Sequence, residues 1–189
     1  MMQVVQNAFA NTSSSLMIGK VQGSIVDTLM PPLSAGEILT GYVVGAVARG
    51  VAVAAVTAAV MFPATGAGLV HWGWALWFVV AGSAILGLAG FLAAMAAEKF
   101  DQMAAITNFV VTPLSFLSGA FYSVEALPWA LKPVAYVNPV FYLIDGLRFA
   151  TLGVSDVSPW IGFGVTALAT AGLARLAWGL LARGWRLKP

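Results

Sequence analysis

Cysteine is absent from this chain of 189 residues, and histidine occurs once, at His71. Without cysteine there is no disulfide framework, no thiolate chemistry and no cysteine-based metal site. One histidine cannot form a histidine-based metal cluster, so we expect His71 to be an interfacial side chain. Charged residues make up only 8% of the chain, with a net charge of +2, whereas ordinary soluble domains carry about 25%. So few charges give no indication of a nucleic-acid partner.

Catalytic and nucleotide-binding motifs are missing as well. The sequence has no Ser/His/Asp set, no carboxylate pair on one helix face and no His-Glu-x-x-His motif. Gly19 and Lys20 come near a phosphate-binding loop, but Val21 stands where that motif has Ser or Thr, and Ser14 stands where it has its first glycine. We therefore expect a non-catalytic chain that binds no cofactor, so that any ATP it depends on would be bound by another polypeptide.

Apolar residues are what the chain has in abundance. Hydrophobic residues make up 60% of it, and the mean hydropathy is +0.91. This composition predicts an integral membrane protein of the all-α class, a polytopic helix bundle that forms one transmembrane domain over residues 1–189. Four apolar runs are expected to cross the membrane: residues 38–62, 75–97, 103–120 and 160–182. Residues 1–18 form a fifth span that is too polar to face lipid alone, so we expect it inside the bundle.

The segment Lys20–Glu37 is polar and lies between two of these spans. Within it we predict a short helix that Ser24 caps, with Asp27 three residues further on, and that ends at Pro31. At a length of ~10 Å this helix cannot cross a bilayer. Its apolar face is made by Val21, Ile25 and Leu29, with Val26 and Met30 beside them. Such a helix, held between two spans, is suited to docking on a cytoplasmic protein.

Small and capping residues add detail to the spans. Ser34 and Glu37 form a capping-box pattern that opens the run 38–62. The pattern Gly41-x-x-x-Gly45 is typical of close helix packing. In the run 75–97, small residues again leave space for a neighbouring helix: Ser83, Gly87, Gly90 and Ala94. Aromatic side chains are expected to form a belt at the entry to that run, together with His71: Trp72, Trp74 and Trp77.

The segment Tyr122–Ser158 is a long connection that does not cross the membrane. Its prolines divide it into two predicted interfacial helices, residues 128–136 and 139–152. Lysine and arginine placement orients the chain, because cytoplasmic loops carry an excess of these residues. Five lie at one end, namely Lys20, Lys99, Arg183, Arg186 and Lys188, against Lys132 and Arg148 at the other. We therefore expect the segment 20–37 and the C-terminal tail in the cytoplasm and the segment 122–158 outside.

Seven residues are candidates for a substrate path or a subunit interface: Arg49, Tyr122, Trp129, Phe141, Tyr142, Asp145 and Arg148. Arg49 is a mid-span charge, which costs about 2.5–3.5 kcal/mol on insertion scales. The alternative for Arg49 is a snorkelling or structurally paired side chain. Asp145 and Arg148 are three residues apart on a predicted helix, where a local ion pair is the alternative. The aromatic candidates could instead anchor the protein at the membrane interface.

Four stretches together resemble the permease subunit of ABC-2 type exporters. These are QNAFANTSSS (residues 6–15), GSIVDTLMPPLSAGE (23–37), LSFLSGAFYSVEALP (114–128) and VNPVFYLIDGLR (137–148). The resemblance implies a permease of the bacterial plasma membrane that forms a dimer, expected to be a homodimer, and binds cytoplasmic ABC ATPase subunits. The segment 20–37 would couple to the ATPase, and the re-entrant outer helices within 122–148 would close the path.

The resemblance also sets expectations for the substrate and the number of spans. Such permeases export amphiphiles, for example a lipid-linked saccharide or a drug, and contact membrane lipid. They have six spans behind an N-terminal amphipathic helix, whereas about five are present here, so we expect the chain to be N-terminally incomplete. The alternatives are a secondary transporter or channel that needs no ATPase, and a membrane assembly protein that transports nothing.

The expected orientation can be tested in this cysteine-free chain. Single cysteines introduced at Ser123 and Ser155 should react with a membrane-impermeant maleimide added to intact cells. Cysteines at Ser24 and Ser34 should react only after the cells are opened. Labelling of the Ser24 position in intact cells would reverse the orientation and remove the basis for a cytoplasmic coupling segment.

Overall fold

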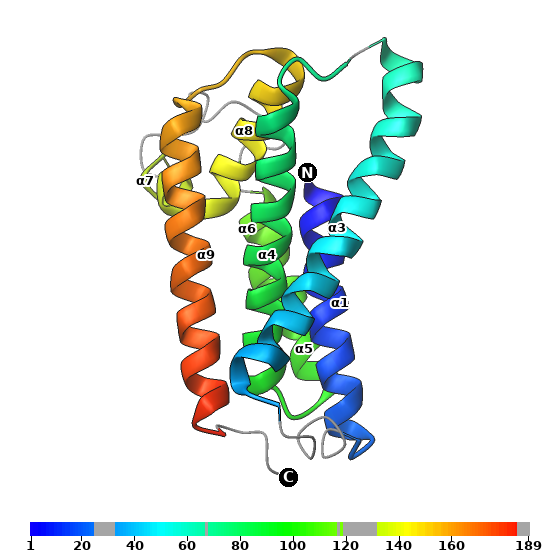
Figure 1. Cartoon of the computed structure of the whole chain (residues 1–189), viewed down its shortest axis with the longest axis vertical. Helices are drawn as coiled ribbons and strands as arrows, with labels where there is room; N and C mark the ends of the chain where they lie inside the picture. The colour runs from blue at the N-terminus through cyan, green and yellow to red at the C-terminus, as the bar shows by residue number, and fades with distance from the viewer. Residues whose placement is uncertain (25–32, 67, 117, 119–131, 185–189) are drawn as a thin grey trace.

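A computed structural model describes residues 1–24, 33–66, 68–116, 118 and 132–184. Those residues form helices and connecting turns, without a strand among them, as the all-α prediction requires. The helices are α1 (Met2–Val21), α3 (Ala35–Thr65), α4 (Trp72–Ala96), α5 (Phe100–Ile106), the π-helix η1 (Thr107–Val111), α6 (Thr112–Phe116), α7 (Lys132–Val137), α8 (Pro139–Leu152) and α9 (Pro159–Ala182). The long helices run roughly alongside one another in alternating directions (Figure 1).

Helix α4 is the centre of this bundle. Helices α1, α3, α8 and α9 all pack against it. Its fully buried side chains include Phe78, Leu88 and Phe91. A helix that is apolar on every side is stable only when other helices or lipid surround it. Here protein surrounds it on most sides, so α4 fixes the places of its neighbours.

Small residues let the neighbouring backbones approach α4 closely. A Cβ atom on Gly90 would lie 2.5 Å from the carbonyl oxygen of Phe9 in α1. A Cβ on Gly50 of α3 would overlap the side chain of Ser83 in α4. A Cβ on Gly87 of α4 would lie 2.5 Å from the Cβ of Ala46 in α3. The predicted small surface of α4 is therefore confirmed as a contact surface.

Among the described residues, Gly41-x-x-x-Gly45 does not have the close helix packing that its pattern predicts. No atom lies within 4 Å of a Cβ built on Gly41, and only the side-chain nitrogen of Asn11 comes within that distance at Gly45, at 3.8 Å. The contact with α4 is made by other residues of α3: the ring of Tyr42 lies 5.2 Å from that of Phe91, and the closest approaches are at Ala46 and Gly50. Helix α3 crosses α1 and α4 and then leans away from the bundle (Figure 1).

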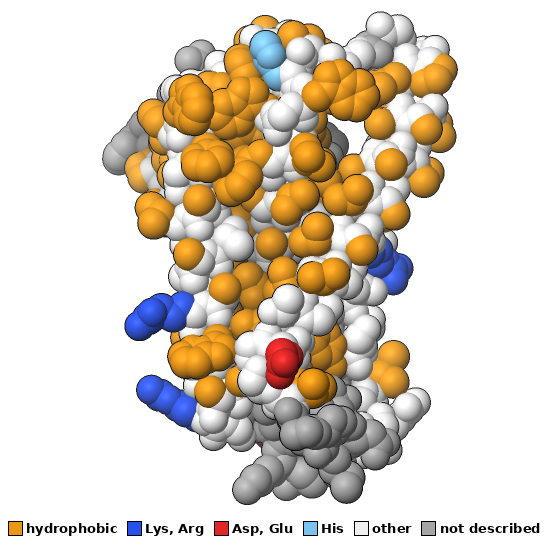
Figure 2. Space-filling view, viewed as in Figure 1, with side chains coloured by type: hydrophobic (Ala, Val, Ile, Leu, Met, Phe, Trp, Pro, Cys, Tyr) orange, Lys and Arg blue, Asp and Glu red, His pale blue; other side chains and the backbone are white. Residues whose placement is uncertain are grey.

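Three helices of the described residues are long and apolar enough to cross a membrane: α3, α4 and α9. Figure 2 shows a surface covered by apolar side chains with few charges, as lipid contact requires. Two further spans were predicted, over residues 1–18 and 103–120. The first is the polar helix α1, and the second is described over 100–116 as α5, the π-helix η1 and α6 in succession. The prediction that residues 1–18 lie in the bundle is confirmed, since α1 buries Val5, Phe9 and Met17.

Helix boundaries agree with the sequence patterns at α8 and at the start of α3 and differ elsewhere. The helix predicted over 128–136 is described as Lys132–Val137, and the run 75–97 is helical over Trp72–Ala96. The interfacial helix predicted over 139–152 is observed with the same bounds, and Ser34 and Glu37 form the predicted capping box. Helix α3 was expected to stop at Phe62 but continues through Pro63 to Thr65. Proline removes the N–H that would bond four residues back, and the helix continues for only two residues beyond Pro63. The helix ends at Gly66, which has a φ of 67° and donates its N–H to the Phe62 carbonyl.

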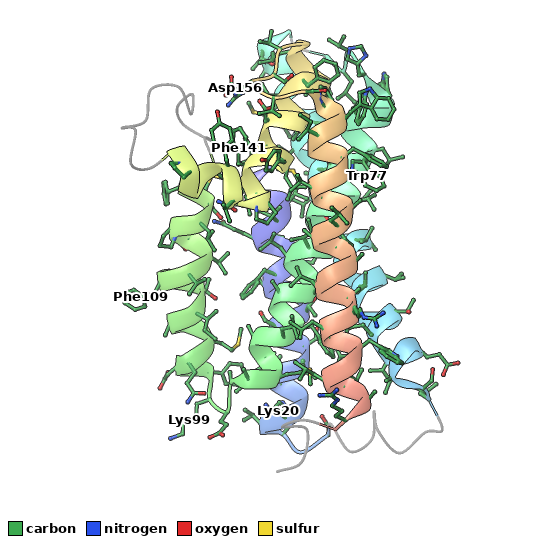
Figure 3. All side chains as sticks on the ribbon, turned by 90° about the vertical axis from the view of Figure 1, so that its left-hand side faces the viewer. Lys20, Trp77, Lys99, Phe109, Phe141 and Asp156 are labelled. Carbon is green, nitrogen blue, oxygen red and sulfur yellow. The ribbon has the colours of Figure 1, made fainter. Side chains whose placement is uncertain are left out.

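The two ends of the bundle carry different basic residues. Lys20 and Lys99 lie at one end (Figure 3), where α9 also finishes with Arg183. Helix α8, which carries Arg148, lies at the opposite end (Figure 1). The structure therefore groups these basic residues as the sequence predicted. Which end faces the cytoplasm stays a prediction.

The close contact at Gly90 makes a paired test of the packing. Gly90→Ala should lower the stability of the protein by about 1–3 kcal/mol, because the new methyl group meets backbone that cannot rotate away. Gly41→Ala, also inside a long helix, should change stability by less than about 0.5 kcal/mol. Thermal unfolding of the purified proteins in detergent, followed by circular dichroism, compares the two. Equal midpoints would contradict the central place given to α4.

Candidate functional site

Helix α1 has one apolar face and one polar face. Its apolar face is buried in the core and carries Val5, Phe9 and Leu16. Its other face is exposed or half-buried and is polar along most of the helix: Gln3, Asn7, Asn11, Ser14 and Ser15. Steps of three or four residues keep these side chains on one side of a helix. A helix at the depth of the membrane thus presents a row of amides and hydroxyls outward.

Arg49 joins this polar face from α3. Its Nη1 donates a hydrogen bond of 3.1 Å to Oδ1 of Asn11. Arg49 is exposed on the bundle surface. The structural alternative predicted for Arg49, a pair with a neighbouring helix, is therefore observed, although the partner is an amide and not a carboxylate. An arginine beside an exposed row of polar groups also leaves the path or interface prediction open.

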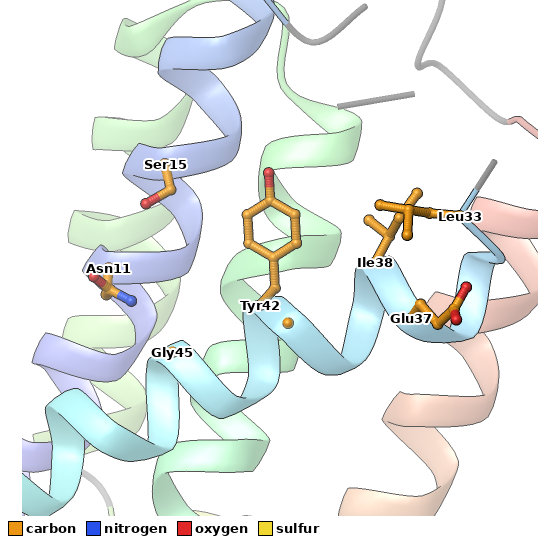
Figure 4. Close-up of a pocket in the computed structure, with 8 residues that line it drawn as sticks. Asn11, Ser15, Leu33, Glu37, Ile38, Tyr42 and Gly45 are labelled. Carbon is orange, nitrogen blue, oxygen red and sulfur yellow. The ribbon is translucent and has the colours of Figure 1, made fainter. Parts of the chain in front are cut away.

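A shallow groove of about 360 Å³ lies between α1 and α3 next to this pair. Its lining residues are Asn11, Ser15, Leu33, Glu37, Ile38, Gly41, Tyr42 and Gly45 (Figure 4). The two glycines leave the wall on α3 low, and Asn11 and Ser15 face them from α1. The groove is amphipathic, since Leu33 and Ile38 flank Glu37 at the end where α3 begins.

Polar groups in this position need a partner other than lipid. Hydrocarbon offers no hydrogen bonds, so polar side chains at membrane depth face protein or a water-filled cavity. Part of the requirement is met locally: Asn7 donates to the Gln3 carbonyl at 3.0 Å, and Ser14 donates to the Asn11 carbonyl at 3.2 Å. The open side of the groove still presents amide and hydroxyl groups. The face of α1 and α3 is therefore the candidate functional site.

At the basic end, Lys20 occupies a place that the sequence did not predict. Its ammonium donates to the carbonyl oxygens of Ala94, Met95 and Ala97, at 3.1, 3.1 and 2.7 Å. These acceptors lie 74 to 77 residues further along the chain. A pairing so distant in sequence leaves no local pattern, whereas the Asn11 position could have been found from its helical spacing with Gln3 and Asn7.

The predicted coupling helix is corrected at its first residue. Val21 was expected on one face with Ile25 and Leu29, but it is the last residue of α1. Gly23 then adopts a φ of 74°, which ends the helical path because only glycine accepts that conformation easily. The other members of the predicted docking face, Ile25, Val26, Asp27, Leu29 and Met30, lie outside the described residues. Ser24 is described, but its capping role is untested for the same reason.

At the opposite end, Asp145 holds the connection between α8 and α9. Its carboxylate accepts the backbone N–H groups of Asp156 and Val157, at 2.9 and 3.0 Å. Arg148 lies 3.6 Å from Asp145 and 3.2 Å from Asp156, so the predicted local pair is confirmed and extended. Burial raises the pKa of Asp145, and the two backbone N–H groups oppose that shift. These contacts assign Asp145 and Arg148 to a structural connection.

Of the four aromatic candidates, two make contacts within the protein and two lie outside the described residues. Phe141 is buried in α8, between the rings of Tyr136 and Tyr142 at centroid distances of 5.5 and 5.1 Å, and is not a surface contact. Tyr142 donates its hydroxyl to the Tyr136 carbonyl at 2.9 Å. Phe141 packs in a small cluster with Tyr142 and Val157, apart from the main core. Tyr122 and Trp129 lie outside the described residues.

The predicted aromatic belt is partly an interhelical cluster. Trp72 is exposed as expected, but Trp74 contacts Trp160 at 5.0 Å, and Trp77 contacts Phe163 at 4.2 Å between ring centroids. His71 stacks on the ring of Phe149 at 4.7 Å. Since α9 and α8 both pack against the start of α4, these rings turn inward onto them.

A second cavity, of about 190 Å³, lies between α4 and the helical run 100–116. Its walls are apolar apart from Ser115, whose hydroxyl donates to the Val111 carbonyl at 2.8 Å. Within the described ranges no group of three or more metal-ligating side chains is present. The same part of the chain has no buried side-chain nitrogen or oxygen without a hydrogen bond. The α1–α3 face therefore remains the candidate site among the described residues.

Comparison with known proteins gives a consistent result. The chain matches the family model of the ABC-2 type transporter over residues 1–152. It is 34% identical over 188 residues to the inner membrane transport permease YadH of Escherichia coli strain K12, covering 100% of this chain and 73% of the relative. The same values hold for the permease YadH of Escherichia coli O157:H7 and of Shigella flexneri. No solved structure matches the chain.

Water access to the groove can be measured by cysteine labelling. Ser15→Cys should react with a charged, membrane-impermeant methanethiosulfonate, because a thiol must ionise to react and does so in a wetted groove. Val56→Cys on the apolar, exposed surface of α3 should stay unmodified, since hydrocarbon suppresses ionisation. Inverted vesicles give the reagent access from the side of the segment 20–37. A Ser15→Cys variant as unreactive as Val56→Cys would show that the groove is dry.

Proposed function

This chain belongs to the ABC-2 type transporter family, and from that premise we propose that it is the permease subunit of an ATP-driven exporter in a bacterial inner membrane. In this proposal a separate ABC ATPase binds and hydrolyses ATP, and the permease moves an amphiphilic substrate such as a lipid-linked saccharide or a drug. The observation that carries the proposal is the polar face of α1 with Arg49, which lies open beside apolar spans.

A second copy of the permease is the proposed cover for that face. An arginine and a row of amides at membrane depth are unstable against lipid. A partner subunit with the same face would enclose them, and the groove along Gly41 and Gly45 would become part of a passage between the two copies. An amphiphile fits such a passage because polar side chains of α1 and apolar side chains of α3 line it together.

Coupling to the ATPase is assigned to the segment 20–37. It joins the end of α1 to the start of α3, at the end of the bundle that holds Lys20 and Lys99 (Figure 3). The capping box of Ser34 and Glu37 fixes where α3 begins, with Glu37 Oε2 accepting the Ser34 backbone N–H at 2.7 Å. At the other end, α7 and α8 would close the path, held in place by Asp145 and Arg148.

The alternatives differ in what they need from the spans. A secondary transporter is driven by ions or protons, so acidic or histidine side chains at mid-span would favour it. In the described spans the charges away from the helix ends are Arg49 and Arg175, both basic. This pattern favours a permease whose energy is supplied by a partner.

The coupling role is tested by substitution in the segment. Leu29→Asp should reduce co-purification of the ATPase at least about tenfold, because losing one buried leucine side chain at an interface costs about 1.5–3 kcal/mol. Insertion of the permease into the membrane should be unchanged, since the segment lies outside the hydrocarbon. The measurement is a pull-down of the ATPase encoded beside the permease, with expression levels matched.

Asp27→Ala serves as the matched control in the same segment. It removes a carboxylate near a helix start, which costs at most about 1 kcal/mol, and leaves the apolar face intact. It should therefore retain most ATPase binding. If the unmodified permease brings down no ATPase, or if Leu29→Asp binds as well as the unmodified protein, the coupling assignment is wrong. An unmodified permease that binds no ATPase would favour a secondary transporter, a channel or an assembly protein.

A further inference from the structure

The side chain of Lys20 connects the ends of two helices that are far apart in sequence. It lies in the last turn of α1 and reaches the last turn of α4. Three carbonyl oxygens there accept its hydrogen bonds, those of Ala94, Met95 and Ala97. A lysine ammonium carries three N–H donors, so the number of donors and of these acceptors is equal.

The end of α4 needs such a partner. The last carbonyl groups of a helix have no N–H donor within the helix and carry a partial negative charge. Helix α4 has no basic residue in its own last turn, and its cap, Ala97, is extended with a φ of −78° and a ψ of 143°. The chain thus leaves α4 at once, without a turn that could satisfy these carbonyls. Lys20 supplies both the donors and the positive charge from the neighbouring helix.

The position of Lys20 in the chain gives this contact a second consequence. Gln22 caps α1, Gly23 turns the chain, and the segment leading to α3 follows. Lys20 is therefore the point at which the start of the segment 20–37 is bonded to the end of α4. At the other border of the segment, the capping box of Ser34 and Glu37 opens α3, with hydrogen bonds of 2.7, 2.8 and 3.3 Å between the two residues.

We propose that Lys20 is a positioning residue that ties the start of the coupling segment to α4, so that movement of the segment is delivered to the central helix of the bundle. The proposal rests on the coupling function assigned above to the segment 20–37. It predicts that the start of the segment and the end of α4 move as one body during the ATPase cycle. From α4 the movement reaches α8 and α9, which both pack against it.

The distance between the two ends is measurable because the chain has no cysteine. Gln22 and Glu98 are exposed and flank the contact, so Gln22→Cys and Glu98→Cys accept a pair of spin labels. Double electron–electron resonance is recorded on the complex of permease and ATPase, with and without ATP and magnesium. With Lys20 present, the distance distribution should be narrow and the same in both states.

Lys20→Met keeps the aliphatic stem and removes all three donors. It should broaden the distribution about twofold, because the end of α1 then opens locally, and the mean distance should now change on adding ATP. Lys20→Arg keeps a charged donor group and should stay close to the unmodified protein. A lysine that only caps α4 would lower the melting temperature when replaced, but the distance would not become dependent on ATP.

The outcomes separate this proposal from the one it rests on. A distribution in Lys20→Met as narrow and as independent of ATP as with Lys20 overturns the tie. If Lys20→Met does not fold, Lys20→Gln, which keeps an amide donor, is measured in its place against the same criterion. If the unmodified permease binds no ATPase, the coupling function fails, while the distribution without nucleotide still decides whether Lys20 holds the two ends together.

Discussion

Hydrocarbon provides no hydrogen-bond partner, and the placement of the polar groups in this chain follows from that constraint. Lys20 reaches across to the last carbonyl groups of α4. Ser83 and Thr166 return their hydroxyls to their own helices, at Val79 and Gly162. The side chains that are satisfied locally can be buried or can face lipid. Those of the α1–α3 face are satisfied only in part, and this difference makes the face the candidate functional site.

The same constraint explains why the centre of the bundle is packed through glycine and serine. Between membrane helices, close van der Waals contact replaces the hydrophobic driving force that acts in water. Gly90 admits the backbone of α1, and the Gly50 and Ser83 positions admit α3. Helix α4 can therefore hold both helices that border the coupling segment. A central helix with such contacts is suited to passing movement from one end of the bundle to the other.

A charged side chain connects helices at each end of the bundle. Lys20 ties the cytoplasmic segment of the proposed topology to α4, whereas Asp145 ties the start of α9 to α8 through the backbone of Asp156 and Val157. Both use a charged side chain on backbone groups, which gives short hydrogen bonds of defined direction. One connection thus joins α1 to α4 and the other joins α8 to α9, while the groove between α1 and α3 stays open.

The sequence by itself determined the helical class, the membrane location, most helix boundaries and the local pair of Asp145 and Arg148, because these depend on composition and on neighbours within a few residues. Tertiary structure alone decided that α4 is the centre, that Asn11 is the partner of Arg49, that Phe141 is buried and that Val21 ends α1. It also brought Lys20 to carbonyl groups 74 to 77 residues away. Contacts of that kind depend on which helix faces meet, and that choice is made by backbone shape and small residues across the whole bundle.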